Sequence, residues 1–144
     1  MMEDINRRSA ITLGLSAAAV VPLFAMAPPA RAAEIPTYGP EEGEEIAPGV
    51  RIMEVGTANS DIPAYKSIQI LDVVFQPGAA DIESAMDNDM VCYIASGEFT
   101  IKKSDKEFTV KEGDYYTCAK GKTDHATNTS SVVGIHRIAI LIPA

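Results

Sequence analysis

Asp124 and His125 are the neighbouring side chains with the most usable chemistry in this chain. A carboxylate beside an imidazole can supply a general acid or base, or two metal ligands. Successive residues on a strand point to opposite faces, so the pair shares a site only if a bulge re-aims His125, which is otherwise a surface histidine. His136 is expected to be a buried strand histidine with a hydrogen-bond partner, or else a ligand. With two histidines, one chain cannot build a three-histidine centre.

Four carboxylates gather shortly before residue 90: Asp81, Glu83, Asp87 and Asp89. They suggest a cation site, but they lack the glycine and terminal glutamate of a calcium-binding loop, and the alternative is an acidic, solvated loop. A re-routed metal site has four weak candidates: Glu83, Asp87, His125 and His136. The sequence contains no Gly-x-Ser-x-Gly elbow, no phosphate-binding glycine loop and no Cys-x-x-Cys pair. Asp124 and His125 are therefore the catalytic candidates.

Three sulfur-bearing side chains follow at short intervals: Met86, Met90 and Cys92. Thioethers and thiolates select soft ions, so one hypothesis is a copper(I) site made from these three residues, with His125 as a fourth ligand. Methionine is also a flexible filler of apolar cavities and a good lining for organic ligands. Under that second hypothesis the same residues line a binding cavity.

Residues 1–32 are predicted to be a signal peptide rather than part of the folded domain. Arg7 and Arg8 precede an apolar stretch, and Ala30 and Ala32 supply the small side chains of a cleavage site. The paired arginines indicate twin-arginine export, so the mature protein is expected in the periplasm or outside the cell. A membrane-anchoring helix is the alternative, although an apolar stretch of roughly 17 residues is short for a span.

The mature chain is predicted to be strongly acidic. Cleavage after Ala32 leaves 9 basic and 18 acidic residues, and hence a net charge of −9, which disfavours nucleic acid and anionic membranes as partners. No second long apolar segment follows, so no membrane association is expected after cleavage, and the export machinery is a partner in transit only. Residues 33–49, with three prolines, three glycines and five glutamates, are predicted to be an acidic linker or arm.

Residues 50–144 are predicted to form one all-β domain. Short runs of β-branched and aromatic residues recur about every ten residues, separated by turn residues. The predicted strands cover residues 50–55, 65–75, 90–95, 98–103, 107–110, 115–119 and 132–142. Because the mature chain shows no helical periodicity, this pattern indicates an antiparallel sandwich or a small barrel.

The spacing of four glycines resembles the two sequence motifs of the cupin superfamily. The first motif fits Gly78 and Gly97, and the second fits Gly113, Gly121 and Asn128, without a gap. Each glycine supplies a turn conformation that a residue with a Cβ resists. The resemblance covers residues 78–128 and implies an antiparallel jelly-roll β-barrel in which both motifs line one cavity. Because cupins often pair through their sheets or terminal arms, it also implies a possible homodimer.

The metal ligands of the family are absent. Where the cupin motifs place two histidines, a glutamate and a third histidine, this chain has Ser84, Met86, Met90 and Asp124. Divalent ions of the hard or borderline class prefer imidazole and carboxylate, so no metal cofactor is expected here and the metal-dependent chemistry of cupins is not carried over. The cavity is instead predicted to be apolar with polar anchors, and its lining is Ser84, Met86, Met90, Cys92, Ile94 and Asp124.

A disulfide between Cys92 and Cys118 is a further implication of the resemblance. In the cupin fold, the strand that ends at Gly97 typically runs antiparallel beside the strand that starts at Gly113. If these glycines are opposite each other, Cys92 is opposite Cys118, at a Cα separation that a disulfide spans. A disulfide, or at least a pair of thiols in contact, is therefore expected, and export would allow the bond to persist.

Three functions remain as hypotheses. The first is an exported cupin domain that has lost its metal site and binds a small organic ligand in its cavity. The second is a cupin enzyme with oxygenase- or isomerase-like chemistry, using a non-standard metal set or an acid–base pair from Asp124 and His125. The third is a periplasmic protein that binds the soft ion copper(I).

Overall fold

The computed structural model describes residues 35–144, which form ten β-strands and no helix. The strands are β1 (Glu44–Ala47), β2 (Val50–Asn59), β3 (Tyr65–Phe75), β4 (Ser84–Ala85), β5 (Asp89–Ser96), β6 (Glu98–Lys103), β7 (Lys106–Lys111), β8 (Tyr115–Cys118), β9 (Thr123–Asn128) and β10 (Gly134–Pro143). Nothing long and apolar enough to be a membrane-crossing helix occurs in this part of the chain. The predicted signal peptide, residues 1–32, lies outside the described residues.

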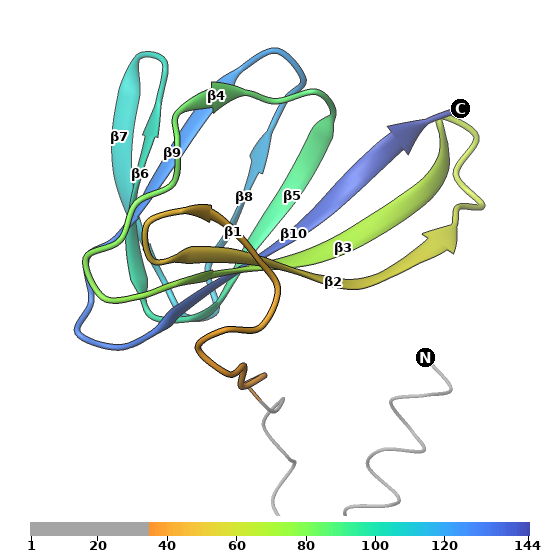
Figure 1. Cartoon of the computed structure of the whole chain (residues 1–144). Coiled ribbons are helices and arrows are strands. Elements are labelled where there is room, and N and C mark those ends of the chain that lie inside the picture. The colour runs from red at the N-terminus through yellow and green to blue at the C-terminus, as the bar shows by residue number, and fades with distance from the viewer. Residues whose placement is uncertain (1–34) are drawn as a thin grey trace, which may run out of the picture. The chain divides into compact units, whose positions relative to one another are not determined.

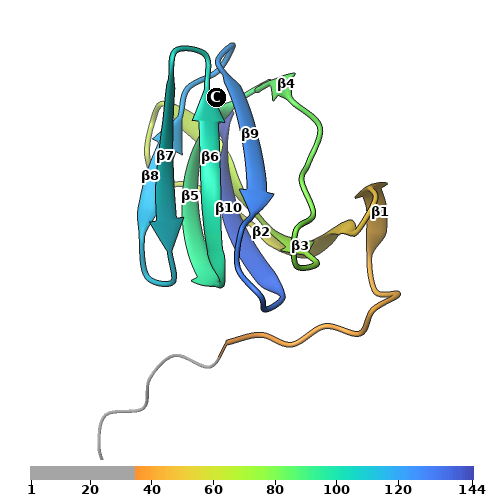
Figure 2. The ribbon, with the colours of Figure 1, turned by 90° about the vertical axis from the view of Figure 1, so that its left-hand side faces the viewer.

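The strands form two antiparallel sheets that face each other (Figure 1). One sheet has six strands in the order β1-β2-β3-β10-β5-β8, and the other has four in the order β4-β9-β6-β7. Figure 2 shows β7, β6 and β9 in front of β8, β5 and β10. The all-β antiparallel prediction is confirmed. The named strands pair within each sheet and not between the sheets, so residues 35–144 form a sandwich, and the predicted closed barrel is not observed.

The core lies between the two sheets and follows the alternation of side chains along the strands. On β5, Met90, Cys92 and Ile94 are buried, while the residues between them face solvent. From the opposing sheet, Phe99 of β6 is fully buried, and its ring meets that of Phe75 edge to face at 5.0 Å between centroids. The interior therefore contains large rings in addition to the sulfur-bearing side chains.

The two faces of β10 pack against different partners. His136 and Ile138 face the interior, where the His136 ring lies 5.7 Å from the ring of Phe99. Ile135 packs on the opposite face, and Arg137 on that face forms an ion pair with Asp72 of β3. The sequence could not decide which set faced the interior; the structure assigns His136 and Ile138 to it.

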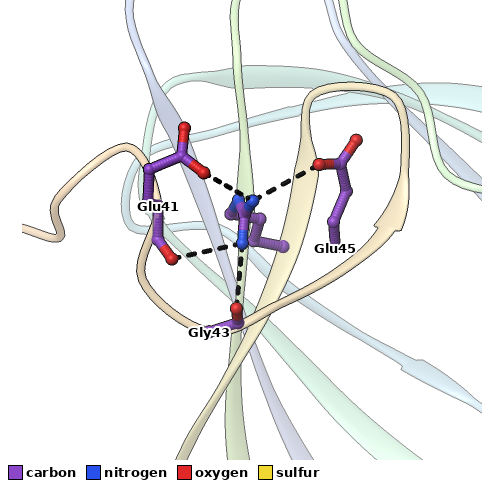
Figure 3. Close-up of polar contacts among 4 residues, drawn as sticks. Glu41, Gly43 and Glu45 are labelled. Carbon is purple, nitrogen blue, oxygen red and sulfur yellow. Dashed lines mark hydrogen bonds and ion pairs between the residues drawn. The ribbon is translucent and has the colours of Figure 1, made fainter.

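We call residues 35–49, from the segment predicted to be an acidic linker or arm, the arm; they include β1, the edge strand of the six-stranded sheet. Its β1 pairs with β2, and Tyr38 packs over a buried cluster on the outer face of that sheet. Arg51 of β2 binds the arm through the carboxylates of Glu41 and Glu45 and the carbonyl of Gly43 (Figure 3). Besides β1, the strand prediction missed β4 and placed no strand at β9, although it located the other seven.

The glycines that carried the cupin resemblance occupy turns of the predicted kind. All four have positive φ angles: Gly78 at 79°, Gly97 at 85°, Gly113 at 89° and Gly121 at 80°. A side chain at Gly97 is excluded for a second reason, since its Cβ would lie 2.9 Å from the Cα of Gly134. These turns bring β5 and β8 of one sheet and β6 and β9 of the other around the same interior.

Candidate functional site

Asp124 is the polar residue at the centre of the candidate site. It faces the interior from β9 and is 5% exposed. Its Oδ2 accepts a hydrogen bond from the hydroxyl of Tyr116 at 3.0 Å. Its Oδ1 has no hydrogen-bond partner among residues 35–144. Burial raises the pKa of the Asp124 carboxyl, because desolvation disfavours the charged form. A buried carboxyl oxygen without a partner is costly for stability and can bind a donor or a cation.

Tyr116 connects Asp124 to His136. The Tyr116 oxygen lies 3.1 Å from Nε2 of His136, and the two rings are stacked with centroids 5.7 Å apart. Burial lowers the pKa of His136 to about 4 and raises the pKa of Tyr116, so both are uncharged at neutral pH. When Tyr116 donates to Asp124, its oxygen can accept from Nε2–H of His136. The three side chains form a buried hydrogen-bond chain that ends at the free Oδ1.

Sequence reasoning missed Tyr116. The available signal was alternation, because residues 116 and 118 share a strand face and Cys118 was already expected to face the interior. The contact of Tyr116 with His136 could not be predicted from the sequence. The two residues lie on β8 and β10, which do not pair with each other. Only the three-dimensional arrangement brings these two side chains together.

His125 lies on the opposite face of β9 from Asp124. The register between β9 and β6 runs from Asp124 to Asn128 without a bulge, so nothing re-aims the imidazole. Its Nε2 is 4.0 Å from Oδ1 of Asp81, which also accepts a hydrogen bond from the Ala126 amide. Burial raises the pKa of Asp81 to about 6. Asp124 and His125 therefore belong to two separate environments and cannot act as one acid–base pair in this arrangement.

The metal sites considered from the sequence are not assembled. Within residues 35–144, no group of three or more His, Cys, Asp or Glu side chains is arranged to hold a metal ion. Of the re-routed set, Glu83 and Asp87 are exposed near β4, whereas His136 is buried in the aromatic interior and His125 faces outwards. The four carboxylates are also divided, because Asp81 binds the Ala126 amide and Asp89 binds the Lys120 amide.

The four positions that correspond to the cupin metal ligands do not fit a divalent ion. Ser84 is exposed on β4, opposite Asp124 in the β4–β9 register. Met86 is half-buried and Met90 is buried, and both offer thioether sulfur. One carboxylate oxygen and two thioethers are a weak ligand set for zinc, iron or manganese. No step of chemistry is therefore derived through such a metal.

The predicted disulfide between Cys92 and Cys118 is wrong, because both cysteines are free thiols. Cys118 is opposite Met90, and Cys92 is opposite Tyr116, so the register differs from the predicted one by two residues. The cause lies at the turn: the Gly97 carbonyl accepts a hydrogen bond from the amide of Glu112 rather than facing Gly113. The two thiols nevertheless belong to one buried cluster with Met90.

The predicted cavity lining is partly brought together. Met90, Cys92 and Cys118 form that buried cluster, and Met86 packs against it. Ile94 belongs to the neighbouring aromatic core, and Tyr116 packs against both clusters. Ser84 is the predicted lining residue that faces solvent. The interior beside Asp124 is thus rich in sulfur and rings, with Tyr116 filling space that the sequence-based picture left to a ligand.

A pocket of about 500 Å³ opens between the β6–β7 turn and the end of β8. Its lining residues are Lys103, Ser104, Asp105, Lys106, Thr117, Ala119 and Lys122. Lys103 joins this pocket to the buried chain of side chains: its ammonium lies 5.1 Å from the centroid of the Tyr116 ring and donates to the carbonyl of Thr117. Its positive charge also partly offsets the rise in the pKa of Asp124.

The pH dependence of stability is expected to carry a signature of His136. Between pH 6.5 and 4 the unfolded histidine binds a proton that the folded one, with a pKa of about 4, does not, so lowering the pH favours unfolding. This effect amounts to about 3 kcal/mol over the window. Asp81 and Asp124 act in the opposite direction, since their raised pKa values mean that the folded state takes up protons first.

The measurement is urea denaturation of the native protein and of His136→Phe between pH 7 and pH 4. Asp81 is not in contact with His136 and contributes to both proteins, so it cancels in the difference between them. We expect the native protein to lose about 3 kcal/mol relative to the variant as the pH falls. A difference that stays constant with pH would show that His136 is not held neutral by burial.

Comparison with known proteins identifies the fold. No protein-family model and no curated protein sequence matches the chain. A cupin superfamily protein from Desulfitobacterium hafniense is similar with a TM-score of 0.54 and 21% identity, covering 78% of this chain and 99% of that one. An RmlC-like cupin from Shewanella frigidimarina has a TM-score of 0.55 and 19% identity, covering 78% and 93%. A Cupin_2 domain of an XRE family transcriptional regulator from Enterobacter cloacae has a TM-score of 0.55 and 17% identity, covering 67% and 99%. Residues 35–144 therefore have the cupin fold.

Proposed function

We propose that this protein is an exported cupin-fold domain that binds a small organic anion, without the divalent metal of other cupins. The observation that carries the proposal is the pocket of about 500 Å³ lined by three lysines, one of which, Lys103, lies over the ring of the buried Tyr116. Its volume is within the roughly 300–1,000 Å³ of small-molecule sites. Export rests on the predicted signal peptide alone.

The charge of the pocket favours an anion. Three lysines, Lys103, Lys106 and Lys122, line it with a single carboxylate, that of Asp105. The chain as a whole has a net charge of −8, so a concentration of lysines at one pocket stands out from the general charge. Ammonium groups form charge-assisted hydrogen bonds to carboxylate or phosphate oxygens, and these are about twice as strong as neutral ones.

The rest of the ligand is expected to be compact and partly polar. The hydroxyl side chains of Ser104 and Thr117 line the pocket, and the Tyr116 ring lies under Lys103. A ligand group that displaces the Lys103 ammonium from its carbonyl partner gains access to the Tyr116 face.

An acid–base enzyme is the second candidate, and the chain from His136 through Tyr116 to Asp124 is the observation that favours it. Burial raises the pKa of the Asp124 carboxyl above its ordinary value, the direction that suits a general acid. Asp124→Asn separates the two functions. It would abolish turnover by an enzyme that uses this carboxyl, while leaving the lysines free to bind the anion.

Anion binding is tested with succinate, citrate and inorganic phosphate as probes, by calorimetry and by thermal unfolding at low ionic strength. We expect at least one probe to stabilise the native protein, by about 2.7 kcal/mol at a hundredfold excess over its Kd. Lys106→Met combined with Lys122→Met should weaken binding by about 100-fold or more, since each lost charge-assisted bond costs roughly 1.5–3 kcal/mol.

The matched control is Lys66→Met, because Lys66 is an exposed lysine on β3 outside the pocket. It changes the net charge without changing the site, and it should leave the affinity within about twofold. If no probe stabilises the protein, or if Lys66→Met weakens binding as much as the pocket variants do, the anion site does not exist.

A further inference from the structure

We propose that Cys92, Cys118 and Met90 form a binding site for a soft monovalent metal ion, with copper(I) as the biological ion. Thiolates and thioethers select such ions. The site is separate from the proposed anion pocket, whose lining residues include none of these three. The two proposals can therefore fail independently.

The strand register places the three sulfur-bearing side chains on one interior face. Met90 and Cys118 are directly opposite each other on β5 and β8, and Cys92 is two residues beyond Met90. Directly opposed residues have Cβ atoms about 4.5–5.5 Å apart, and diagonal neighbours such as Cys92 and Cys118 are about 7–8 Å apart. All three are buried in one cluster, and both thiols are free.

This spacing suits a bridging ion better than a disulfide. A disulfide needs Cβ atoms about 3.5–4.5 Å apart, which the diagonal placement of Cys92 and Cys118 does not favour. Two metal–sulfur bonds of about 2.3 Å, the length found for zinc, allow the sulfur atoms to be up to roughly 4.6 Å apart. Rotation of the two Cβ–Sγ vectors towards the Met90 sulfur is then sufficient to make a three-coordinate site.

A second, independent feature at this place is the buried carboxylate of Asp124. Its Oδ1 has no partner in residues 35–144, and its Oδ2 accepts a hydrogen bond from Tyr116, whose side chain packs against the sulfur cluster. A buried carboxyl oxygen without a partner and two free thiols thus lie on either side of Tyr116 in the described part of the chain. A metal cation at the sulfur atoms would compensate the charge of this carboxylate.

Binding of copper(I) at this site needs no change in the oxidation state of copper or sulfur. Copper(I) enters, two S–H bonds break, and two Cu–S bonds form. One proton passes to Asp124 Oδ1, which lacks a hydrogen bond, and the other leaves to solvent. The Met90 thioether adds a neutral third ligand. Net charge is conserved, and Asp124 then carries a proton on the oxygen that lacked a partner.

The ligand set excludes the commoner divalent ions. Zinc and iron sites need three or more His, Cys, Asp or Glu ligands, and no such group is arranged within residues 35–144. His125, the fourth copper ligand considered from the sequence, faces away on β9 and is replaced by Cys118. Met86 is half-buried and packs against the cluster, so a further thioether lies beside the three proposed ligands.

The test is an anaerobic titration of the reduced full chain with copper(I), and separately with silver(I) as a redox-inert analogue. We expect one ion per chain by native mass spectrometry, protection of both thiols from alkylation, and no comparable uptake of zinc. Cys92→Ser and Cys118→Ser should each weaken binding by more than about 100-fold, beyond the roughly 10–100-fold loss typical of outer-shell changes. Met90→Leu, which preserves volume, should weaken it about tenfold.

Met53→Leu is the matched control, because Met53 is a buried methionine in a different cluster on the outer face of the six-stranded sheet. The affinity of this variant for copper(I) and silver(I) should equal that of the native protein. The proposal is overturned if the folded native protein takes up neither ion. It is also overturned if the double variant Cys92→Ser with Cys118→Ser retains the stoichiometry. Release of two protons per copper from the native protein would contradict the proposed transfer of one proton to Asp124.

Discussion

Replacing Arg137 with methionine is expected to lower the free energy of unfolding by about 2–4 kcal/mol. Asp72 is fully buried, and Arg137 binds both of its oxygens, with Nε to Oδ1 at 2.7 Å and Nη2 to Oδ2 at 2.8 Å. Removing the guanidinium leaves a buried carboxylate whose remaining partner is the Tyr38 hydroxyl at 2.5 Å. The Arg137 side chain is 37% exposed, which places the loss below the upper end of the roughly 3–5 kcal/mol typical of a broken buried pair.

Arg51→Met is the matched control for this prediction. Arg51 also pairs with two carboxylates, Glu41 and Glu45 (Figure 3), but their side chains are 89% and 53% exposed. Exposed pairs contribute about 0–1 kcal/mol, so this variant should lose less than about 1 kcal/mol. Urea denaturation at pH 7 measures both. Equal losses in the two variants would mean that burial of Asp72 does not determine the cost.

A double variant separates the buried charge from the packing of the arm. Asp72→Leu combined with Arg137→Met removes both charges and fills their places with apolar groups, which often restores stability. We expect the double variant to be more stable than Arg137→Met alone. If the double variant is less stable than the single one, the contact of Tyr38 with Asp72 contributes more than the ion pair.

Turn residues made the fold predictable from the sequence. Gly97 and Gly113 adopt backbone conformations that favour glycine, and such positions are fixed by local sterics that a spacing pattern can capture. The register of strand pairing depends on the residue at which each strand leaves its turn. The Gly97 carbonyl accepts a hydrogen bond from the Glu112 amide rather than facing Gly113. With this register, Cys118 is opposite Met90 and not opposite Cys92. An error of two residues in the predicted strand register is therefore the difference between the predicted disulfide and the two free thiols.

The candidate site was predictable only in part, for a related reason. Alternation along β5 and β9 correctly assigns Met90, Cys92 and Asp124 to the interior and His125 to the outside. The contact between Tyr116 and His136 joins strands that do not pair, and the lysine pocket joins the β6–β7 turn to the end of β8. The Tyr116–His136 contact spans β5 within the six-stranded sheet, whereas the lysine pocket depends on how the two sheets stack. No periodicity within one strand encodes either arrangement.

Asn128→Ala is expected to destabilise the fold by about 3–5 kcal/mol, since several buried groups would lose their partners at once. The Asn128 side chain is fully buried, and its Nδ2 donates to the carbonyls of Phe75 at 3.1 Å, Gln76 at 3.3 Å and Val132 at 2.8 Å. Its Oδ1 accepts from the amide and the hydroxyl of Ser130. The residue thereby ties the end of β3 to the loop that leads into β10.

Asn128→Asp tests whether the lost donor or the lost volume is responsible. The aspartate keeps the size and the acceptor for Ser130, but it presents an oxygen to carbonyl oxygens, so we expect a loss at least as large as that of Asn128→Ala. Asn59→Ala, at an exposed asparagine on β2, should change stability by less than about 0.5 kcal/mol. A mild effect of Asn128→Asp would contradict the hydrogen-bond account. Asn128 belongs to the glycine framework by this reasoning: it holds turns together, while the chemistry of the interior rests with Asp124, Tyr116 and the thiols.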